Sequence, residues 1–453
     1  MTKAKLTQGS VSTGLFNLTL PMILGITSSL ITAVFETYLL GLVGTDELAA
    51  YSFTFPVVGA LSSLSLGISI GLSSVLARAV GGGNATQVTR LATDGIALNF
   101  SVMLLVTLIG LLTIGPLFRL MGADETTLRL IVSYMHVWYL GLIFFSLPSM
   151  GANALRATGD ARISGTIMVA GALMQMILDP FLILGLLGFP RLGIEGAAWA
   201  MLISRALLCV ATFYVLIHQK RLIVLTRTKL QDVLHSWRQI LAVGLPATAT
   251  NLISPISTAI VVSMLAGYGK EAVAGFGIAS RVESLSIIPL FALSASIGPF
   301  VGQNWGANQF RRANHAMKLS FAWAMLWGVL VALLFLLLHE SIGHYFDDNE
   351  DVIEYTSQYL LIVPISYGAW GVLMMSSAIF NSLGKPLSST LMSVVRMFVI
   401  YVPLAYLGQQ LFGVTGIFVA ACISNTVMGI AGFIWNRYTY LPIISKQISP
   451  PSA

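Results

Sequence analysis

Twelve long apolar runs constrain this chain more than any other feature of its sequence. Each run is long enough to cross the hydrocarbon core of a bilayer, which takes about 20 consecutive apolar residues in a helix. Lipid offers no hydrogen-bond partners to the backbone, so each run is expected to form an α-helix. The chain is therefore predicted to be an all-α integral membrane protein with twelve transmembrane helices, near residues 14–42, 51–79, 92–115, 131–158, 163–187, 194–217, 239–267, 276–303, 317–338, 354–382, 388–410 and 414–436.

The charged residues support this interpretation by their scarcity and by their positions. Only 9% of the 453 residues are charged, against roughly a quarter in soluble domains. If the chain starts inside, 17 of the 24 Lys and Arg fall in inner segments and four in outer ones. This distribution follows the positive-inside rule and predicts a multi-pass protein of the cell (inner) membrane with both termini cytoplasmic. The net charge of +6 then reflects the Lys and Arg on the inner side of the membrane, and no nucleic-acid partner is expected.

The sequence repeats itself at a fixed distance. Leu20-Pro21 recurs as Leu245-Pro246, and GIEGAAWAMLIS (193–204) matches GVTGIFVAACIS (413–424). The chain is thus predicted to consist of two pseudosymmetric six-helix lobes. Six is even, so the repeats are parallel, their axis runs along the membrane normal, and a pathway between them is expected. The predicted domains are an N-terminal lobe, a cytoplasmic linker and a C-terminal lobe, over residues 1–217, 218–238 and 239–453.

Two acids lie within predicted spans of the first half only. Glu36 corresponds to Val261 in the second half, and Asp179, in ILDPFLILG, corresponds to Leu404. Symmetry that folding requires would be kept in both halves, so the acids indicate function. Counting 1.5 Å per residue from the outer helix ends places both acids about 10–12 Å below the outer surface. At that depth they are expected to share a cavity.

Four further residues complete the predicted site in the first half. Gln175 lies one turn from Asp179 on the same helical face and is able to donate a hydrogen bond to it. Tyr139 and Met201 lie at a similar depth, and Arg205 follows Met201 by one turn. Burial and a neighbouring carboxyl group both disfavour the charged form of a carboxyl, so a Glu36–Asp179 pair could load and release a proton. The same oxygens could hold Na⁺, and the alternative is a buried salt bridge with Arg205.

The second half carries ionisable residues of its own. Arg281 and Glu283 are candidates for the second lobe; they are two residues apart, so they do not face each other and each needs another partner. Arg396 is interpreted as a packing or gating contact. The histidines of HESIGH (339–344) are five residues apart, which is unsuited to a zinc helix, and no P-loop motif occurs. We therefore expect no metal site and no cofactor, and transport would use an ion gradient or a partner ATPase.

With these motifs in view, the sequence resembles the multidrug and toxic compound extrusion (MATE) transporters along essentially its whole length. The resemblance rests on LPMILG…FETYLLGLVGTDELAAYSF, on ILDPFLILG, and on GLPATATNLI…GIASRVESL…GPFVGQNWGANQFRRA. The Asp-Pro pair at 179–180 is similar to the DinF-like branch of that family.

The resemblance implies an exporter of organic, often cationic, compounds by proton or Na⁺ antiport through two lobes in a V-shaped fold. In DinF-like members the cavity of the N-terminal lobe carries an Asp, an Asn, an Asp and a Thr. Only Asp179 matches; Glu36, Gln175 and Met201 stand at the other three positions, and Arg205 stands where Gln is common. The lost Thr hydroxyl removes a hard oxygen ligand, so protons are favoured over Na⁺ as the coupling ion.

The sequence leaves other functions open. A lipid-linked oligosaccharide or other lipid flippase of the same wider superfamily would need a strongly cationic cavity, for which Arg205, Arg281 and Arg396 are available. A membrane-embedded enzyme would need clustered His, Ser or Cys with acids, and a channel would need a pore-loop signature. The favoured prediction is not an enzyme but a monomeric antiporter that exports small organic cations or amphipathic drugs in exchange for protons.

Overall fold

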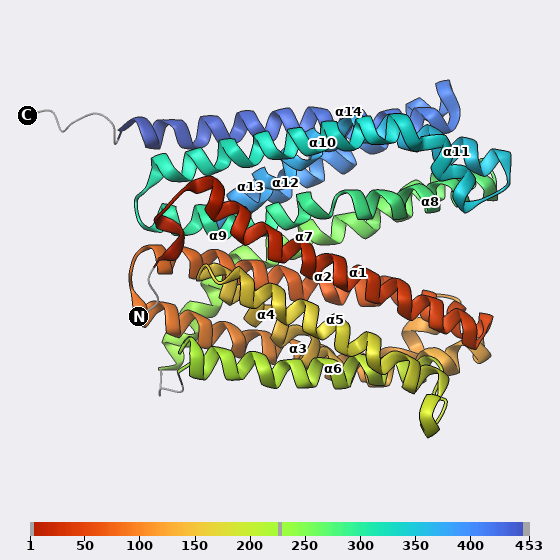
Figure 1. Cartoon of the computed structure of the whole chain (residues 1–453), viewed down its shortest axis with the longest axis horizontal. Coiled ribbons are helices and arrows are strands. Elements are labelled where there is room, and N and C mark those ends of the chain that lie inside the picture. The colour runs from red at the N-terminus through yellow and green to blue at the C-terminus, as the bar shows by residue number, and fades with distance from the viewer. Residues whose placement is uncertain (1–3, 225–228, 447–453) are drawn as a thin grey trace, which may run out of the picture. The chain divides into compact units, whose positions relative to one another are not determined.

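The computed structural model describes residues 4–224 and 229–446, and in these ranges every regular element is a helix (Figure 1). In the first half of the chain the helices are α1 Val11–Val43, α2 Thr45–Gly81, α3 Ala85–Leu120, α4 Glu125–Ala157, α5 Ala161–Leu184 and α6 Ile194–Tyr214. In the second half they are α7 Leu230–Ala266, α8 Lys270–Ser286, α9 Ile288–Gly306, α10 Phe310–Phe346, α11 Glu350–Ile362, α12 Tyr367–Ser382, α13 Pro386–Val394 and α14 Val402–Lys446.

These helices confirm the twelve predicted spans. Ten stretches of the described chain are long and apolar enough to cross a membrane, and α8 with α9 forms an eleventh that is bent by 45°. The longest stretch, Pro386–Tyr440, holds two spans because Gly413 leaves the helical conformation at φ 61° and ψ −138°. The predicted all-α membrane fold is therefore confirmed, although several helices, such as α3 and α10, extend well beyond the predicted ends of the apolar runs.

Three spans of the second half are interrupted, which the hydropathy pattern did not predict. Pro289 lies in the first turn of α9, and a proline there removes the N–H that would continue α8. Pro364 lies in a short 3₁₀ segment, Val363–Ser366, between α11 and α12. The third interruption is a π-helical segment, Val395–Tyr401, between α13 and α14. Such departures from α-helix occur often at functional sites.

The chain divides into two compact units. The first consists of Met1–Lys5 and Leu20–Thr248, and the second of Leu6–Thr19 and Ala249–Ala453. The lobes predicted from the repeat, 1–217 and 239–453, differ from these units at two places. The start of α1 belongs to the second unit and the start of α7 to the first, whereas the prediction has α1 in the first lobe and α7 in the second. Backbone packing accounts for the difference at α7, because a Cβ at Gly71 would lie 2.4 Å from the Ile240 carbonyl oxygen.

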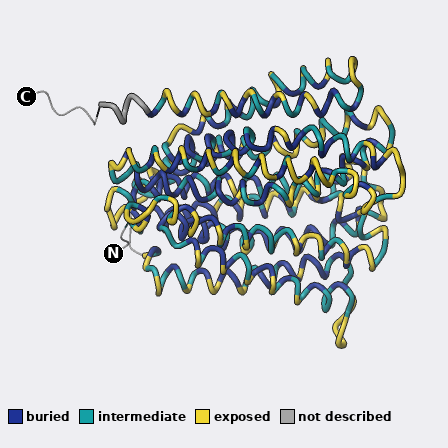
Figure 2. Tube along the Cα trace, turned by 45° about the horizontal axis from the view of Figure 1, so that its top comes forward, coloured by how far each residue is buried: buried dark blue, intermediate teal, exposed yellow. Residues whose placement is uncertain are grey.

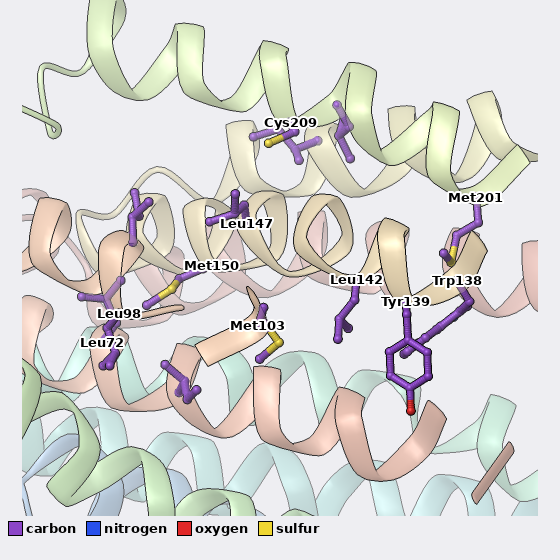
Figure 3. Close-up of a cluster of buried hydrophobic side chains, with 14 of the residues drawn as sticks. Leu72, Leu98, Met103, Trp138, Tyr139, Leu142, Leu147, Met150, Met201 and Cys209 are labelled. Atoms are coloured by element: carbon purple, nitrogen blue, oxygen red, sulfur yellow. The ribbon is translucent and has the colours of Figure 1, made fainter. Parts of the chain in front are cut away.

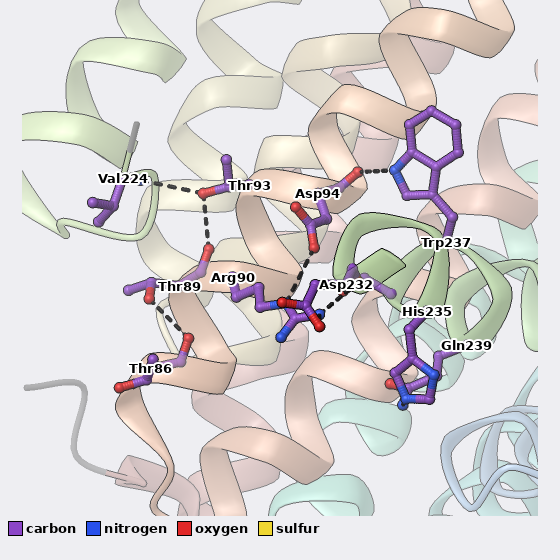
Figure 4. Close-up of polar contacts among 11 residues, drawn as sticks. Thr86, Thr89, Arg90, Thr93, Asp94, Val224, Asp232, His235, Trp237 and Gln239 are labelled. Atoms are coloured by element: carbon purple, nitrogen blue, oxygen red, sulfur yellow. Dashed lines mark hydrogen bonds and ion pairs between the residues drawn. The ribbon is translucent and has the colours of Figure 1, made fainter. Parts of the chain in front are cut away.

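The predicted linker, 218–238, is only partly a connection between helices. From Leu230 onward it is helical and forms the start of α7. Figure 4 shows how this start is held on α3: Arg90 lies 3.6 Å from the Asp94 carboxylate and 3.4 Å from that of Asp232, and the Trp237 indole donates to the Asp94 carbonyl. Polar contacts thus fix this part of the linker within the first unit.

Buried and exposed residues follow one another along each helix (Figure 2). The core of the first unit is built mainly from apolar residues of α2, α3, α4, α5 and α6, together with Leu39 and Leu40 of α1 and Ile240 of α7. Large apolar side chains also lie on the surface, such as Leu112 and Leu337, which are 82% and 79% exposed. On a soluble protein such exposure would be costly, but these side chains suit contact with lipid.

Candidate functional site

Helices α1 and α5 bring the two predicted acids into one buried cluster. The Thr32 hydroxyl is shared between the Ser28 carbonyl of its own helix, at 2.9 Å, and the Ala172 carbonyl of α5, at 3.3 Å, which places the two helices side by side. One turn further along each helix, the Gln175 amide donates to the Glu36 carboxylate at 3.3 Å. Gln175 was expected to donate to Asp179; its partner is instead Glu36, the acid on the opposite helix.

Asp179 is the most buried member of the cluster. Its side chain is 0% exposed, and neither carboxylate oxygen accepts a hydrogen bond from any residue in the described part of the chain. It lies within electrostatic range of Glu36. A buried carboxyl with no protein partner calls for an explanation, and the simplest is a site that binds a proton or a ligand.

Two tyrosines outside the predicted site lie beside these acids. The Tyr51 hydroxyl, on α2, lies beside the Glu36 carboxylate. Tyr134, on α4, lies within electrostatic range of both acids, and its ring meets the Tyr51 ring edge-on at 5.6 Å. Tyr134 faces the cluster from the same helix as Tyr139, so choosing by helical face as well as by depth would have found it.

Tyr139 lies elsewhere, although depth alone had selected it. A Cβ on Gly110 would lie 2.1 Å from the Tyr139 ring, so the ring packs directly against α3. Figure 3 shows Tyr139 and Met201 among the buried side chains of the first unit. The Met201 methyl would lie 3.0 Å from a Cβ on Gly141, so its thioether packs on α4. In this structure both residues are part of the hydrophobic core.

Arg205 does not pair with either acid. Within the described residues no ion pair joins its guanidinium to Glu36 or Asp179, although it lies within electrostatic range of Glu36. Its guanidinium carbon lies 5.5 Å from the centre of the Phe145 ring. The buried Asp179–Arg205 salt bridge, considered as an alternative from the sequence, is therefore absent from this part of the chain.

The second unit has a polar cluster beside its broken spans. Glu283, near the end of α8, accepts a hydrogen bond from the Tyr359 hydroxyl at 2.7 Å. Arg396, in the π-helical segment, donates to Asn425 at 2.9 Å, and Asn425 donates to Ser366 at 3.1 Å. Arg281 is exposed. Of the two candidates in this half, Glu283 therefore lies in a polar network, and Arg281 has an exposed side chain.

A separate ion cluster lies between α4 and α5, outside the spans. Asp160 lies 2.6 Å from the Lys5 amine and 2.8 Å from that of Lys220. Burial by itself raises the pKa of Asp160, but the hydrogen bonds from Lys220 and Lys5 outweigh it and hold the pKa below its ordinary value. Asp160 therefore stays ionised at neutral pH, and this cluster is structural.

Asp160→Asn is expected to lower the free energy of unfolding by about 1–2 kcal/mol, because it removes two charge-assisted contacts of a half-buried carboxylate. Denaturant unfolding of the purified protein at pH 7 measures this. The effect is present above the ordinary carboxyl pKa and is lost as pH falls through the lowered one. Lys5→Gln is the milder control, because the Lys5 side chain is 54% exposed. Equal unfolding midpoints for Asp160→Asn and wild type would contradict a structural role.

Comparison with known proteins identifies the family. The MatE family model matches this chain twice, over residues 21–181 and 246–407. The chain belongs to the MatE family. The two matched segments begin 225 residues apart, which is the offset of the internal repeat. Members of this family are transporters, so this MatE protein is a transporter and not an enzyme.

Individual relatives of this MatE protein span almost the whole chain. It is 36% identical over 417 residues to a FAD transporter of Shewanella oneidensis, with 92% of each protein covered. It is 27% identical over 411 residues to the "Probable multidrug resistance protein YoeA" of Bacillus subtilis, with 87% of each covered. The crystal structure of the Vibrio cholerae MATE transporter VcmN in the bent form superposes with a TM-score of 0.89 at 26% identity, covering 94% of this chain and 95% of that one. The fold expected from the resemblance is thereby confirmed; the DinF-like branch stays a prediction.

Proposed function

We propose that this MatE protein exports organic, cationic, drug-like compounds in exchange for protons, with Glu36 and Asp179 as the coupling unit. One observation carries the proposal: two buried carboxyl groups from α1 and α5 lie in one cluster, and Asp179 has no hydrogen-bond partner within the described residues. Ionisable groups inside a membrane mark ion and substrate pathways by default.

Competition between protons and the cation for the two carboxyl groups accounts for their exchange. When the carboxyl groups are ionised, their negative charge and the aromatic rings of Tyr51 and Tyr134 favour an amphipathic cation. When protons neutralise the carboxyl groups, that attraction is lost and the cation is released. Alternating exposure of the site to the two sides of the membrane would then couple proton entry to export.

Protons suit this cluster better than Na⁺. Sodium is a hard cation that needs several oxygen ligands. Gln175 directs its amide N–H, and not its oxygen, to Glu36, and Met201 packs on α4, so neither residue supplies an oxygen ligand to the cluster. The proposal includes an inner-membrane location, cytoplasmic termini and a monomeric state, as the charge distribution and the repeat architecture suggest.

A second candidate substrate comes from the relatives. The Shewanella protein, at 36% identity, is named a FAD transporter, and FAD is an aromatic anion rather than a cation. Arg205 is the residue of the first unit that favours this candidate. Release of FAD into the medium by cells that overproduce this chain would support it. A lipid flippase is less well supported, because in the second unit the Arg396 guanidinium is engaged by Asn425.

Cells that lack their own efflux pumps are expected to retain severalfold less cationic dye when they express this protein, because an apolar site with acids suits such solutes. Dye retention across a broad panel measures the effect. In liposomes that contain the protein, adding substrate should cause a release of protons, and the rate of this release should depend on the pH gradient. Dye exchange with Na⁺ as the only gradient would contradict proton coupling, and unchanged retention of every dye would contradict multidrug export.

A further inference from the structure

Arg205 is an intramembrane cation without a carboxylate partner in the described chain. Its Nε atom is buried and makes no hydrogen bond to a described residue, and no carboxylate oxygen in those residues comes within ion-pair distance of its guanidinium. An ionised group taken out of water is costly unless it is paired. Stability alone therefore does not explain the position of Arg205. We interpret an anionic ligand as the partner of its guanidinium.

The surroundings of Arg205 hold its guanidinium in a defined position. The Phe145 ring on α4 lies 5.5 Å from the guanidinium carbon. On α5, the absent side chain of Gly171 makes room, because a Cβ there would lie 3.3 Å from the Arg205 Nη1 atom. The aromatic face stabilises the cation without using any of its N–H donors. The Nε–H donor, which has no hydrogen-bond partner among the described residues, stays available in the plane of the guanidinium.

This position is next to the proposed coupling site. Gly171 lies one turn before Gln175, whose amide donates a hydrogen bond to Glu36. Arg205 lies within electrostatic range of Glu36. A planar guanidinium with free N–H donors matches the oxygens of a carboxylate or a phosphate in a two-pronged geometry, which a lysine cannot reproduce. The neighbouring Phe145 ring offers a surface for an aromatic scaffold.

We propose that Arg205 and Phe145 form an oxyanion subsite, which selects aromatic substrates that carry a carboxylate or phosphate group. The inference rests on the proposed export function and names a substrate class for the same site. A substrate with both an amine and an oxyanion would engage the acids and Arg205 together, whereas an aromatic anion would bind through Arg205 alone. The inside-negative membrane potential favours the exit of such an anion.

The test compares probes that share a scaffold and differ in charge. Fluorescein and rhodamine 123 both contain a xanthene ring system, but fluorescein is an aromatic carboxylate and rhodamine 123 is a cation. 4-Methylumbelliferyl phosphate adds an aromatic phosphate. Binding of each probe to the purified full-length protein is measured by fluorescence, and export is measured in liposomes. The variants are Arg205→Gln, Arg205→Lys and Phe145→Leu, with Arg162→Gln as control, an exposed arginine on α5.

Arg205→Gln is expected to lower the ratio of fluorescein to rhodamine 123 affinity at least tenfold, and Phe145→Leu to lower it less. Arg205→Lys should recover part of the loss because it keeps the charge but not the planar donors. The ratio should stay at the wild-type value in Arg162→Gln. Selectivity confined to one anionic probe would assign the subsite to carboxylates or to phosphates.

Two results would overturn the subsite: no binding of either anionic probe by the wild type, or an unchanged ratio in Arg205→Gln. Failure of the proposed function has a different signature, in which wild-type liposomes export none of the probes under a pH gradient. Because binding is measured separately from export, the subsite is tested even in that case.

Discussion

Asp179→Asn is expected to abolish proton-driven export while leaving the protein folded in the membrane. Asparagine keeps the shape of aspartate and its capacity for hydrogen bonds, but it cannot exchange a proton. The carboxylate makes no hydrogen bond to a described residue, so the substitution breaks no hydrogen bond in this part of the chain. Dye efflux from liposomes under a pH gradient should fall to the level of protein-free liposomes, and the unfolding midpoint should stay near that of the wild type.

Glu36→Gln should be nearly as severe as Asp179→Asn, because Glu36 shares the cluster. The double variant should be little worse than either single one, since residues that act as a unit have non-additive effects. Additive losses in the double variant would show that the two acids act independently. Tyr51→Phe, which removes only the hydroxyl next to Glu36, should retain part of the export.

A purely structural role for Asp179 predicts different results. If Asp179 served to neutralise Arg205, its loss would leave a buried cation and cost about 3–5 kcal/mol of stability. Arg205→Gln in the same chain would then restore both expression and export. The lack of an ion pair between these residues argues against this role. Recovery of proton-coupled export in the double variant would refute the coupling role of Asp179.

The spans and the acid pair could be predicted from sequence for physical reasons. A bilayer forces apolar residues into long helices, so hydropathy alone locates them. Charged residues inside such runs are costly, so Glu36 and Asp179 stand out. Side-chain contacts across helices depend on rotation about each helix axis, which depth does not specify. For that reason depth predicts Tyr139 but not Tyr134, and it does not predict that Gln175 donates to Glu36.

The unit boundaries could not be predicted from the repeat. The repeat locates equivalent positions, but it does not say which neighbours a helix packs against. In both halves the start of the first helix belongs to the unit formed mainly by the other half. Leu6–Thr19 is part of the second unit, and the start of α7 is part of the first. The Asn304 amide donates to the Leu6 carbonyl at 3.1 Å, and the Leu6 N–H donates to Gln303 at 3.1 Å. Gln303 and Asn304 belong to the VGQNWGAN motif, which thus holds the chain ahead of α1.

Gly196→Ala is expected to impair folding and export together, because α5 and α6 touch through their backbones at this point. A Cβ on Gly196 would lie 2.3 Å from the Leu182 carbonyl oxygen and 2.9 Å from the Ile183 nitrogen. That carbonyl already accepts a hydrogen bond from the Leu192 N–H at 3.1 Å, so it cannot move aside without breaking this contact. Overpacking of this kind costs about 1–3 kcal/mol.

The same strain should reach the site, because Leu182 follows Asp179 by less than one turn of α5. Pushing this turn away from α6 displaces the Asp179 carboxyl, so the export rate per folded molecule should fall as well as the unfolding midpoint. Gly115→Ala is the matched control, since a Cβ on that α3 glycine meets nothing within 4 Å and alanine stabilises a helix interior by about 0.5–1 kcal/mol. If Gly196→Ala matched Gly115→Ala in unfolding midpoint and export, the close α5–α6 contact would not be what holds Asp179 in place.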